Sequence, residues 1–423
     1  MNQWGCFTRL EPAHVCRHFA VFFEGVAIQY FKFNINGLIE RHLLDGFSGG
    51  SPIFVQRGEA MGFKHQVQQI CDTPSEAIER LVRVPMERPS ILQADEVLVE
   101  IRAAGLSWVD MMMMCGVYQH RPQLPYTPGM EYSGVVVDAG SRALQIFSIG
   151  DRVLSDGFAV GPRSSSAHQH YGGFASCAVA PASALMPLPP QLSFAQGCNL
   201  LGNYETAHHA LVHCAELKAG DTVLINGATG ATGLAAVHLA KILGATVIAT
   251  GRSAEKLSVV RDQGADFVLK LERDEEGGYR FKNQVRSCLG GRGVDAVYDG
   301  VGGGVIEHSL RSLRFGGTYV VVGWASTPFV SKKKEGPKTN QIPSNLVLMK
   351  GLKVMGSPAV ISAQKLPHLR AKRHEDLFRW IKDGKLLPHC HRVYASSQLK
   401  EALLAKWNGA IVGGVAIQMS ESS

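Results

Sequence analysis

The stretch from residue 221 to 256 constrains the fold of this 423-residue chain more than any other. A short apolar run, Val223–Ile225, is followed by glycines at 227, 230 and 233 and then by apolar residues at helical spacing, namely Leu234, Val237, Ile242 and Leu243. Such a run is typical of a strand buried on both faces of a parallel sheet, and the spacing indicates a helix that packs on it. With the second strand at Thr246–Thr250, the pattern predicts a nucleotide-binding β-α-β unit.

The glycine turn of this unit predicts where a phosphate binds. Glycine lets the backbone approach a pyrophosphate without a Cβ clash, and the first helical turn offers unpaired N–H groups and the positive end of its dipole. An ordinary turn that binds nothing is the alternative, but the strand, helix and second strand in register favour a binding site. The predicted cofactor-binding residues are Gly227, Ala228, Thr229, Gly230, Ala231, Thr232 and Gly233.

The tip of the second strand indicates which dinucleotide binds. A site that prefers NAD usually carries Asp or Glu there, to hold the ribose hydroxyls. Here the tip carries Arg252 and Ser253, with Lys256 one turn later. Arginine can clamp a 2′-phosphate through two hydrogen bonds, and lysine adds a point charge. We therefore expect NADPH; the alternative is that Arg252 and Lys256 only solvate the start of a helix.

Bulk composition limits the class of protein. With 45% hydrophobic residues the chain can bury a large core, and its length suggests two or three domains. A formal charge of +7 favours anionic ligands mildly and makes nucleic acid an unlikely partner. No apolar run is long enough to span a membrane. Nine scattered cysteines without a Cys-x-x-Cys pair indicate reduced, mostly buried thiols, so we expect a cytoplasmic protein, with the mitochondrion as the alternative.

The chain divides into four segments. Residues 1–60 differ in composition from the rest and are expected to be an extension, either disordered or used for targeting. Residues 62–195 contain short strands separated by turns, which predicts a barrel-like β domain. Strands alternate with helices in 196–340, which predicts an α/β fold with a doubly wound parallel sheet. Residues 341–423 are expected to return to the β domain through a last strand, Gly414–Ile417.

Two later strands of the α/β segment end at glycines. Asp295–Tyr298 is followed by Gly302, and Thr318–Val322 by Gly323. In such sheets ligands bind beyond the carboxyl ends of the strands. Both glycines are therefore predicted to line the cofactor.

Four motifs together resemble the medium-chain dehydrogenase/reductase superfamily, and within it the zinc-free quinone oxidoreductase and enoyl reductase branch. They are Pro128–Gly134, Gly150–Val153, Gly172–Ala175 and the turn at 227–233. The resemblance covers about residues 62 to 420. It implies a GroES-like β-barrel domain interrupted by a Rossmann domain, with the active site in the cleft between them.

Zinc-dependent members of this superfamily carry ligands that the chain lacks. They have a cysteine near the position of Ser107 and a histidine where this chain has Met130. A catalytic zinc needs thiolate and imidazole ligands, which neither residue supplies. Segment 155–171, where relatives hold four close cysteines, has none. We therefore expect no metal, and direct hydride delivery to a small hydrophobic electrophile such as a quinone, an enone or an activated alkene.

The acceptor must carry the developing negative charge, so the protein has to orient it and donate a hydrogen bond to its oxygen. The resemblance places Tyr118 and Ser107 at the cleft, and Tyr118 is the first candidate for a substrate-orienting residue. The alternative is a Tyr118 ring packed against the loop 122–126. The run Met111–Met114 predicts either a soft apolar wall of the cleft or core packing.

The resemblance implies further contacts with the cofactor. It places Thr206 near the nicotinamide carboxamide, and Asn345 and Lys350 on the far side of the cofactor. Two departures from relatives stand out. The segment Leu269–Leu271 replaces a tyrosine that some relatives use for the 2′-phosphate, and the closing strand has Gly413-Gly414 instead of the usual Gly-Lys.

Other functions and assemblies stay open at this stage. Relatives often form dimers through sheet edges near 315–323, so a homodimer is expected. An enoyl-thioester reductase is the first alternative function, and Lys332–Lys334 with Lys338 would then grip a phosphopantetheine or coenzyme A group. A member of the fold that binds nucleic acid or protein is an alternative of another class.

Overall fold

The computed structural model describes residues 22–23, 26–27 and 60–420, apart from 88, 90, 165, 274, 276–277 and 330–339. The chain divides into two compact units, residues 1–57 and 58–423. In the first unit the description is limited to an antiparallel pair, β1 (Phe22–Phe23) with β2 (Val26–Ala27). The predicted N-terminal extension otherwise lies outside the described residues. Everything below concerns the second unit.

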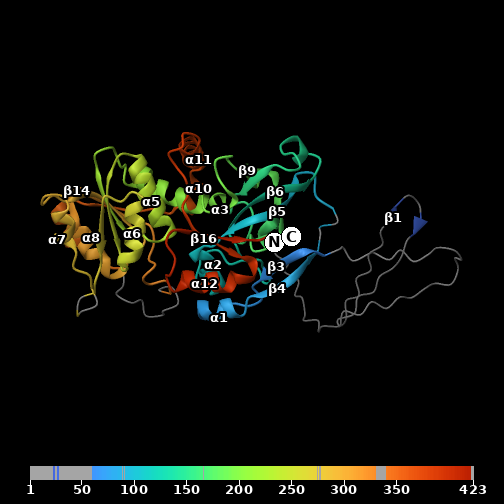
Figure 1. The fold of residues 1–423 in the computed structure, drawn as a ribbon, viewed down its shortest axis with the longest axis horizontal. Coiled ribbons are helices and arrows are strands. Elements are labelled where there is room, and N and C mark those ends of the chain that lie inside the picture. Colours follow the sequence, from blue (N-terminus) through green and yellow to red (C-terminus); the bar gives the residue numbers. More distant parts are fainter. Residues whose placement is uncertain are drawn as a thin grey trace, which may run out of the picture. The chain divides into compact units, whose positions relative to one another are not determined.

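The first part of this unit, here called the β domain, is built on a seven-stranded sheet (Figure 1). Its order is β16-β17-β5-β6-β7-β9, and β8 also pairs with β5. β3 (Ala60–Gln66) and β4 (Val82–Glu87) form a separate antiparallel strand pair, and α1 (Pro74–Glu79) lies between them in the sequence. The sheet strands are β5 (Glu96–Gly105), β6 (Glu131–Ala139), β7 (Arg152–Ser155), β8 (Cys177–Pro181), β9 (Leu185–Pro187), β16 (Cys390–Ala395) and β17 (Gly414–Gln418).

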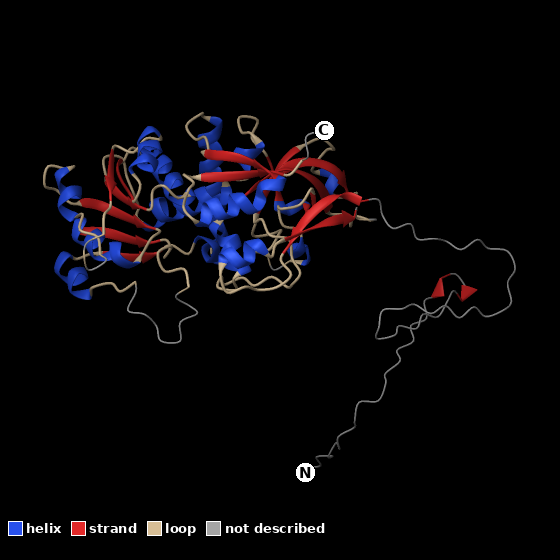
Figure 2. Cartoon of the chain, turned by 60° about the horizontal axis from the view of Figure 1, so that its bottom comes forward, coloured by secondary structure: helices blue, strands red, loops and turns tan. Residues whose placement is uncertain are grey.

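The second part, the nucleotide domain, is a six-stranded parallel sheet with helices on both faces (Figure 2). Its order is β12-β11-β10-β13-β14-β15. The strands are β10 (Thr222–Asn226), β11 (Thr246–Gly251), β12 (Phe267–Lys270), β13 (Val294–Asp299), β14 (Leu313–Val321) and β15 (Lys353–Gly356). The helices are α5 (Ala231–Ile242), α6 (Ala254–Asp262), α7 (Lys282–Ser287), α8 (Ile306–Ser312) and α9 (Ser344–Lys350).

The apolar run in β10 explains why this sheet is covered twice. Successive side chains of a strand point to opposite faces. Val223 and Ile225 therefore join one core together with Leu234 of α5, whereas Leu224 joins the other with Leu310 of α8. The predicted doubly wound parallel sheet is confirmed.

Two sequence-based expectations about the edge of this sheet are corrected. The predicted boundary at residue 340 is too early, because β15 and α9 follow it and β15 pairs with β14. The predicted dimer edge near 315–323 is also wrong, because β14 has β13 on one side and β15 on the other. The last strand of the sheet is β15.

Four further helices and the closing strand connect the two domains. Helices α3 (Phe194–Gly197), α4 (Leu201–His208), α10 (Ala359–Lys365) and α11 (Pro367–Lys382) belong to the connecting segments, and a π-helical turn, His209–Cys214, continues α4. The side chain of Asn199 donates from Nδ2 to the Val415 carbonyl at 3.2 Å. Gly413 N donates to Thr229 O at 2.9 Å, so β17 starts directly at the glycine turn.

The predicted return of Gly414–Ile417 to the β domain is confirmed, since β17 pairs with β5. None of the helices in the described residues combines the length and the apolar character that a membrane crossing needs.

Candidate active site

The glycine turn is shaped for a close backbone approach. Gly227 has φ +72°, a conformation that side chains disfavour. A Cβ on Gly233 would lie 2.2 Å from the Gly227 carbonyl oxygen, so only glycine lets α5 start this close to β10. The helix begins with Leu234 N donating to Gly230 O, which leaves the N–H groups of residues 231–233 without helical partners. The turn therefore matches the predicted phosphate site in its local geometry.

A buried polar cluster holds the strand ends beneath this turn. Asn226 donates from Nδ2 to Ser309 Oγ at 2.8 Å. The Asp299 carboxylate accepts from the Tyr319 hydroxyl and, through its other oxygen, from Gly302 N at 3.1 Å. Burial raises the pKa of Asp299, and these hydrogen bonds oppose the rise. The cluster ties together the carboxyl ends of β10, β13 and β14, and the sequence analysis missed it, although Asn226 and Asp299 each end a strand.

The tip of β11 keeps two cations near the nucleotide end. Ser253 caps α6 by accepting from Lys256 N at 3.3 Å, and Arg252 beside it is exposed. Lys256 is half-buried, and its Nζ comes within 4.0 Å of where a Cβ on Gly409 would stand. Partial burial lowers the pKa of Lys256, and the neighbouring Arg252 adds to this. The side chain thus turns toward the closing segment of the β domain.

A third cation lies at this tip that sequence reasoning did not assign. Lys270, in the segment that replaces a relative's tyrosine, pairs in register with Gly251 across β11 and β12. Its Nζ donates to Glu272 Oε1 at 2.9 Å at the surface. Register with the strand that ends at Arg252 is the signal that would have found it.

Of the residues expected on the far side of the cofactor, one makes other contacts, and the contacts of the other with the cofactor are not assigned. Lys350 Nζ donates to the carbonyl oxygens of Leu310 and Leu313, at 2.8 and 2.5 Å, so it caps the end of α8 and is not free to approach the cofactor. Asn345 is exposed on α9 and its cofactor role stays a prediction. Gly323 N donates to the Asp299 carbonyl at 3.2 Å, which places it beside the Gly302 loop.

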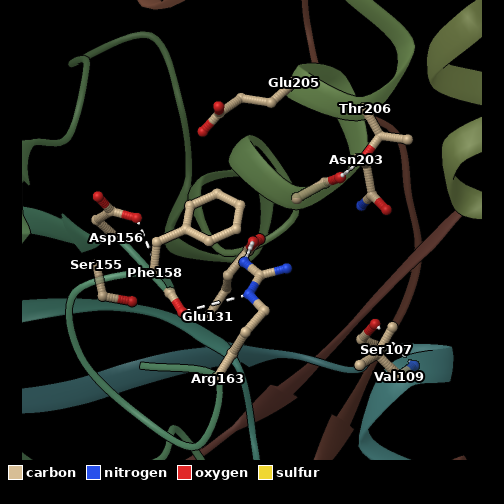
Figure 3. Close-up of polar contacts among 12 residues, drawn as sticks. Ser107, Val109, Glu131, Ser155, Asp156, Phe158, Arg163, Asn203, Glu205 and Thr206 are labelled. Atoms are coloured by element: carbon tan, nitrogen blue, oxygen red, sulfur yellow. Dashed lines mark hydrogen bonds and ion pairs between the residues drawn. The ribbon is translucent and has the colours of Figure 1, made fainter. Parts of the chain in front are cut away.

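On the β domain, Ser107 starts a short helix. It caps α2 (Trp108–Met114), since its Oγ accepts from Val109 N at 3.2 Å (Figure 3). Its own N donates to Asp110 Oδ2 at 3.0 Å. Asp110 is fully buried, and its other oxygen accepts from Gly129 N at 2.9 Å. Burial raises the pKa of Asp110 to about 6. The Ser107 O–H keeps the ability to donate.

The structure answers the expectation about the methionines at 111–114 but not the one about Tyr118. The Tyr118 ring is half-buried against the β-domain core, 5.9 Å from the His120 ring. Its role as the substrate-orienting residue stays a prediction. Met111–Met114 are all buried, with Met112 the most exposed at 6%, so the core-packing alternative holds for this run.

Glu131 forms the centre of a buried charged group. Its Oε1 accepts from Arg163 Nη2 at 3.4 Å, and a Cβ on Gly202 would stand only 2.4 Å from the same oxygen. In Figure 3 the carboxylate lies between Arg163 and the helix that carries Thr206 and Asn203. Burial raises the pKa of Glu131 to about 7, and the Arg163 charge opposes the rise.

Arg370 of α11 extends this group across the domain junction. It makes a two-bond pair with Asp156 of the β domain, at 2.7 and 2.8 Å, and two bonds to Glu205 of α4, at 3.1 and 3.0 Å. The Phe158 ring lies between Arg370 and Arg163, 4.6 and 4.1 Å from their guanidinium carbons. Although burial alone would raise the pKa of Glu205, hydrogen bonds from His374 and Arg370 lower it to about 2. The junction is thus held by charges that the sequence analysis did not identify.

Thr206 follows Glu205 directly. Its Oγ1 donates to the Gly202 carbonyl at 2.7 Å, and the side chain is half-buried. Thr206 therefore lies next to the charged group at the junction, and its place near a nicotinamide carboxamide stays a prediction.

The donor set at the junction does not suit a zinc ion. The Ser107 oxygen already accepts a helix N–H, Met130 offers a thioether, and Glu131 is paired with a guanidinium. Catalytic zinc takes three protein ligands from histidine, cysteine and carboxylate side chains. Across the described part of the chain, no group of three such residues could hold a metal ion.

Comparisons with known proteins agree with this architecture. Residues 93–190 match the alcohol dehydrogenase GroES-like domain, and residues 231–367 match a family described as zinc-binding dehydrogenase.

Relatives give the branch. The chain is 32% identical over 313 residues to a quinone oxidoreductase-like protein 2 homolog of Nematostella vectensis, covering 74% of this chain and 78% of the relative. It is 32% identical over 318 residues to quinone oxidoreductase-like protein 2 of Bos taurus, covering 75% and 83%. A mycobacterial structure complexed with NADPH is 28% identical, with a TM-score of 0.68, covering 84% of this chain and 99% of that one. The chain is therefore an oxidoreductase of the medium-chain dehydrogenase/reductase superfamily and belongs to its quinone oxidoreductase branch.

Proposed function

We propose that the protein is an NADPH-dependent oxidoreductase that reduces quinones or α,β-unsaturated carbonyl compounds without zinc. One observation carries this proposal. The glycine turn has the backbone shape that a phosphate needs, and cations lie at the tip of the next strand. Through Gly413 the turn faces the β domain, and the polar groups of the β domain at this place are not a set of zinc ligands.

The choice of NADPH rests on the nucleotide end. The fold supports a nicotinamide cofactor, with the N–H groups of residues 231–233 for its pyrophosphate. Exposed Arg252 and half-buried Lys256 offer two positive charges for a 2′-phosphate. The mycobacterial neighbour was complexed with NADPH, which supports the same choice.

The chemistry follows from what the junction residues can do. When bound, the nicotinamide supplies a hydride for a conjugated acceptor. The protein must then keep the two flat groups together and stabilise the charge that reaches the acceptor's oxygen. The Ser107 hydroxyl, whose oxygen accepts a helix N–H but whose proton is free, and the Tyr118 phenol are two candidate donors.

The experiment is NADPH oxidation by the purified protein against a panel of quinones, enones and enoyl thioesters. NADH is the control for the cofactor, and a chelator is the control for metal. We expect chelator-resistant reduction of quinones or enones with NADPH preferred. Chelator-sensitive oxidation of alcohols would contradict the mechanism.

The same purified protein also serves to test the two alternative functions. The basic segment that would grip an enoyl thioester, Lys332–Lys334 with Lys338, lies outside the described residues, so only the enoyl-thioester arm of the panel tests it. A nucleic-acid-binding role would be indicated by binding that falls steeply with salt and survives removal of Arg252 and Lys256.

We also propose a homodimer that forms at β15 and not at β14. Large apolar side chains are exposed on this strand and on the helix before it, with Met355 of β15 at 39% and Leu348 and Met349 of α9 at 80% and 75%. An apolar edge of this kind is a natural site for strand pairing between copies. Light scattering should give twice the chain mass for the wild type and the monomer mass for Met349→Glu with Leu348→Glu.

We place the protein in the cytoplasm, with the mitochondrion as the alternative. The described residues contain no disulfide, and most of their cysteines are buried. Buried cysteines without disulfides are typical of a reducing compartment.

A further inference from the structure

Helix α12 (Leu399–Trp407) carries a lysine on the face that packs into the β domain. Leu399, Ala402 and Leu403 are buried on that face. Lys406 follows at the same helical spacing, seven residues after Leu399, so its stem continues the buried stripe. A lysine at such a position has its ammonium taken out of bulk water, which is unfavourable unless an anion lies near it.

Two acidic groups act on this ammonium, but neither forms a hydrogen bond or an ion pair with it. Within the described residues the Lys406 ammonium makes no hydrogen bond or ion pair, and the groups that act on its charge are Asp110 of α2 and Cys390 of β16. Both oxygens of Asp110 are already used, by Ser107 N and Gly129 N. Burial lowers the pKa of Lys406 to about 8, although Asp110 and Cys390 oppose this. The ammonium therefore has donors to spare for a ligand.

Aromatic rings from both domains meet at Trp407, the residue that follows this lysine at the end of α12. Trp407 stacks on Trp108, with ring centroids 4.9 Å apart and an angle of 28°. Phe329, in the loop after β14, meets Trp407 edge-on at 6.3 Å. Trp108 directly follows Ser107, so these rings border the corner where the substrate is expected. Flat conjugated molecules gain from such contacts.

We propose that Lys406 is the residue that binds the acceptor's carbonyl oxygen, and that the acceptors are flat quinones or aryl enones whose rings lie beside Trp108 and Trp407. This inference deepens the proposed function and rests on it. It assigns to one lysine the charge stabilisation for which Tyr118 and Ser107 were the sequence-based candidates.

A hydride adds to the acceptor carbon with its electron pair, forming a C–H bond, and the displaced π pair moves through the conjugated system to the carbonyl oxygen. The acceptor is reduced by two electrons. One N–H bond of the Lys406 ammonium breaks and its proton forms the new O–H bond, and the amine then regains a proton from water.

A phenolate probe tests the inference without turnover. The protein without cofactor is titrated with p-nitrophenol, followed by the visible absorbance of the phenolate and by quenching of tryptophan fluorescence. We expect the protein to bind the phenolate and lower the pKa of the bound phenol. Lys406→Met should weaken phenolate binding about ten-fold, the loss of one charge-assisted hydrogen bond, and leave neutral p-nitroanisole binding unchanged. Lys406→Arg should restore much of the phenolate affinity.

Lys400→Met is the matched control. Lys400 is exposed on the same helix and donates to the Glu79 carbonyl at 2.7 Å, so the variant removes the same charge away from the junction. It should leave both affinities unchanged. Circular dichroism checks that each variant is folded, and Lys406→Arg keeps the test decisive if Lys406→Met does not fold.

The outcomes separate this inference from the proposed function. Unchanged phenolate binding in Lys406→Met overturns the inference, even if the wild type reduces quinones with NADPH. Weaker NADPH binding in that variant, with phenolate binding intact, also overturns it, because the lysine would then hold the cofactor's pyrophosphate. Lost phenolate binding in a protein that reduces neither quinones nor enones supports the anion site and contradicts the proposed function.

Discussion

The glycine turn and the group of charged side chains around Glu131 are two parts of the candidate active site, and they are built by different means. The turn uses backbone: Gly227, Gly230 and Gly233 lie within seven consecutive residues, and the proposed binding depends on their N–H groups and shape. The corner uses side chains from separate segments, with Glu131, Arg163, Glu205 and Arg370 packed out of water. A backbone site depends on space, whereas a side-chain site depends on charge balance. The two should fail differently when they are mutated.

The largest effect is expected at the turn. Gly233→Val would bring side-chain carbons against the Gly227 carbonyl oxygen, where even a Cβ would lie at 2.2 Å. We expect NADPH binding to be lost, measured by quenching of protein fluorescence. Gly356→Ala is the control, because nothing lies within 4 Å of its added Cβ. Normal NADPH binding by Gly233→Val would show that binding does not depend on the lack of room for a side chain at this turn.

The next effect is at the charged corner. Arg370→Met leaves Asp156 buried without a guanidinium and removes one cationic partner of Glu205, which should lower the free energy of unfolding by about 3 to 5 kcal/mol. Urea unfolding measures it. Arg379→Met on the same helix removes a half-exposed partner of Asp376 and should cost less than about 1 kcal/mol. Equal losses in the two variants would contradict a charge-balanced corner.

The pH dependence of stability sharpens the same comparison. The folded pKa of Glu131, about 7, lies above its ordinary value of 4.5, so folding favours the protonated form. Its contribution is fully present below pH 4.5 and is lost as the pH rises through 7. Relative to Glu131→Gln, the wild type should lose up to about 3 kcal/mol of unfolding free energy between pH 4.5 and 8.

Urea midpoints of both proteins across this pH range give the difference. Gly356→Ala, far from the corner, should follow the wild type at every pH. A constant difference between wild type and Glu131→Gln would mean that Glu131 stays ionised in the folded protein.

The smallest effect is at the edge of the nucleotide site. Arg252→Ala should weaken NADPH binding about ten-fold, because a charge-assisted hydrogen bond to phosphate contributes about 1.5 to 3 kcal/mol and the site is exposed. NADH binding should stay the same. Arg261→Ala, at the other end of α6, is the control. Equal losses of affinity for NADPH and NADH would show that Arg252 does not bind a 2′-phosphate.

The comparison also explains which predictions succeeded. The parallel sheet, the return of Gly414–Ile417 and the place of the glycine turn were predictable, because each depends on a local pattern of apolar residues and glycines. The edge of the sheet was predicted at the wrong strand, because β15 begins only at Lys353, far along the chain from β14, and its pairing is not local. Lys350 was assigned to the cofactor, yet its position on α9 brings it to the end of α8.

The sequence by itself determined the nucleotide unit and the absence of thiolate and imidazole at Ser107 and Met130, since both depend on which residues occupy consecutive or motif positions. Only the tertiary structure decided that Glu131 meets Arg163, that Arg370 joins Asp156 to Glu205, and that α12, the helix of Lys406, packs against α2 and β16. The physical reason is that a buried charge is set by neighbours far away in the chain. No local pattern specifies which of them will be brought out of water together.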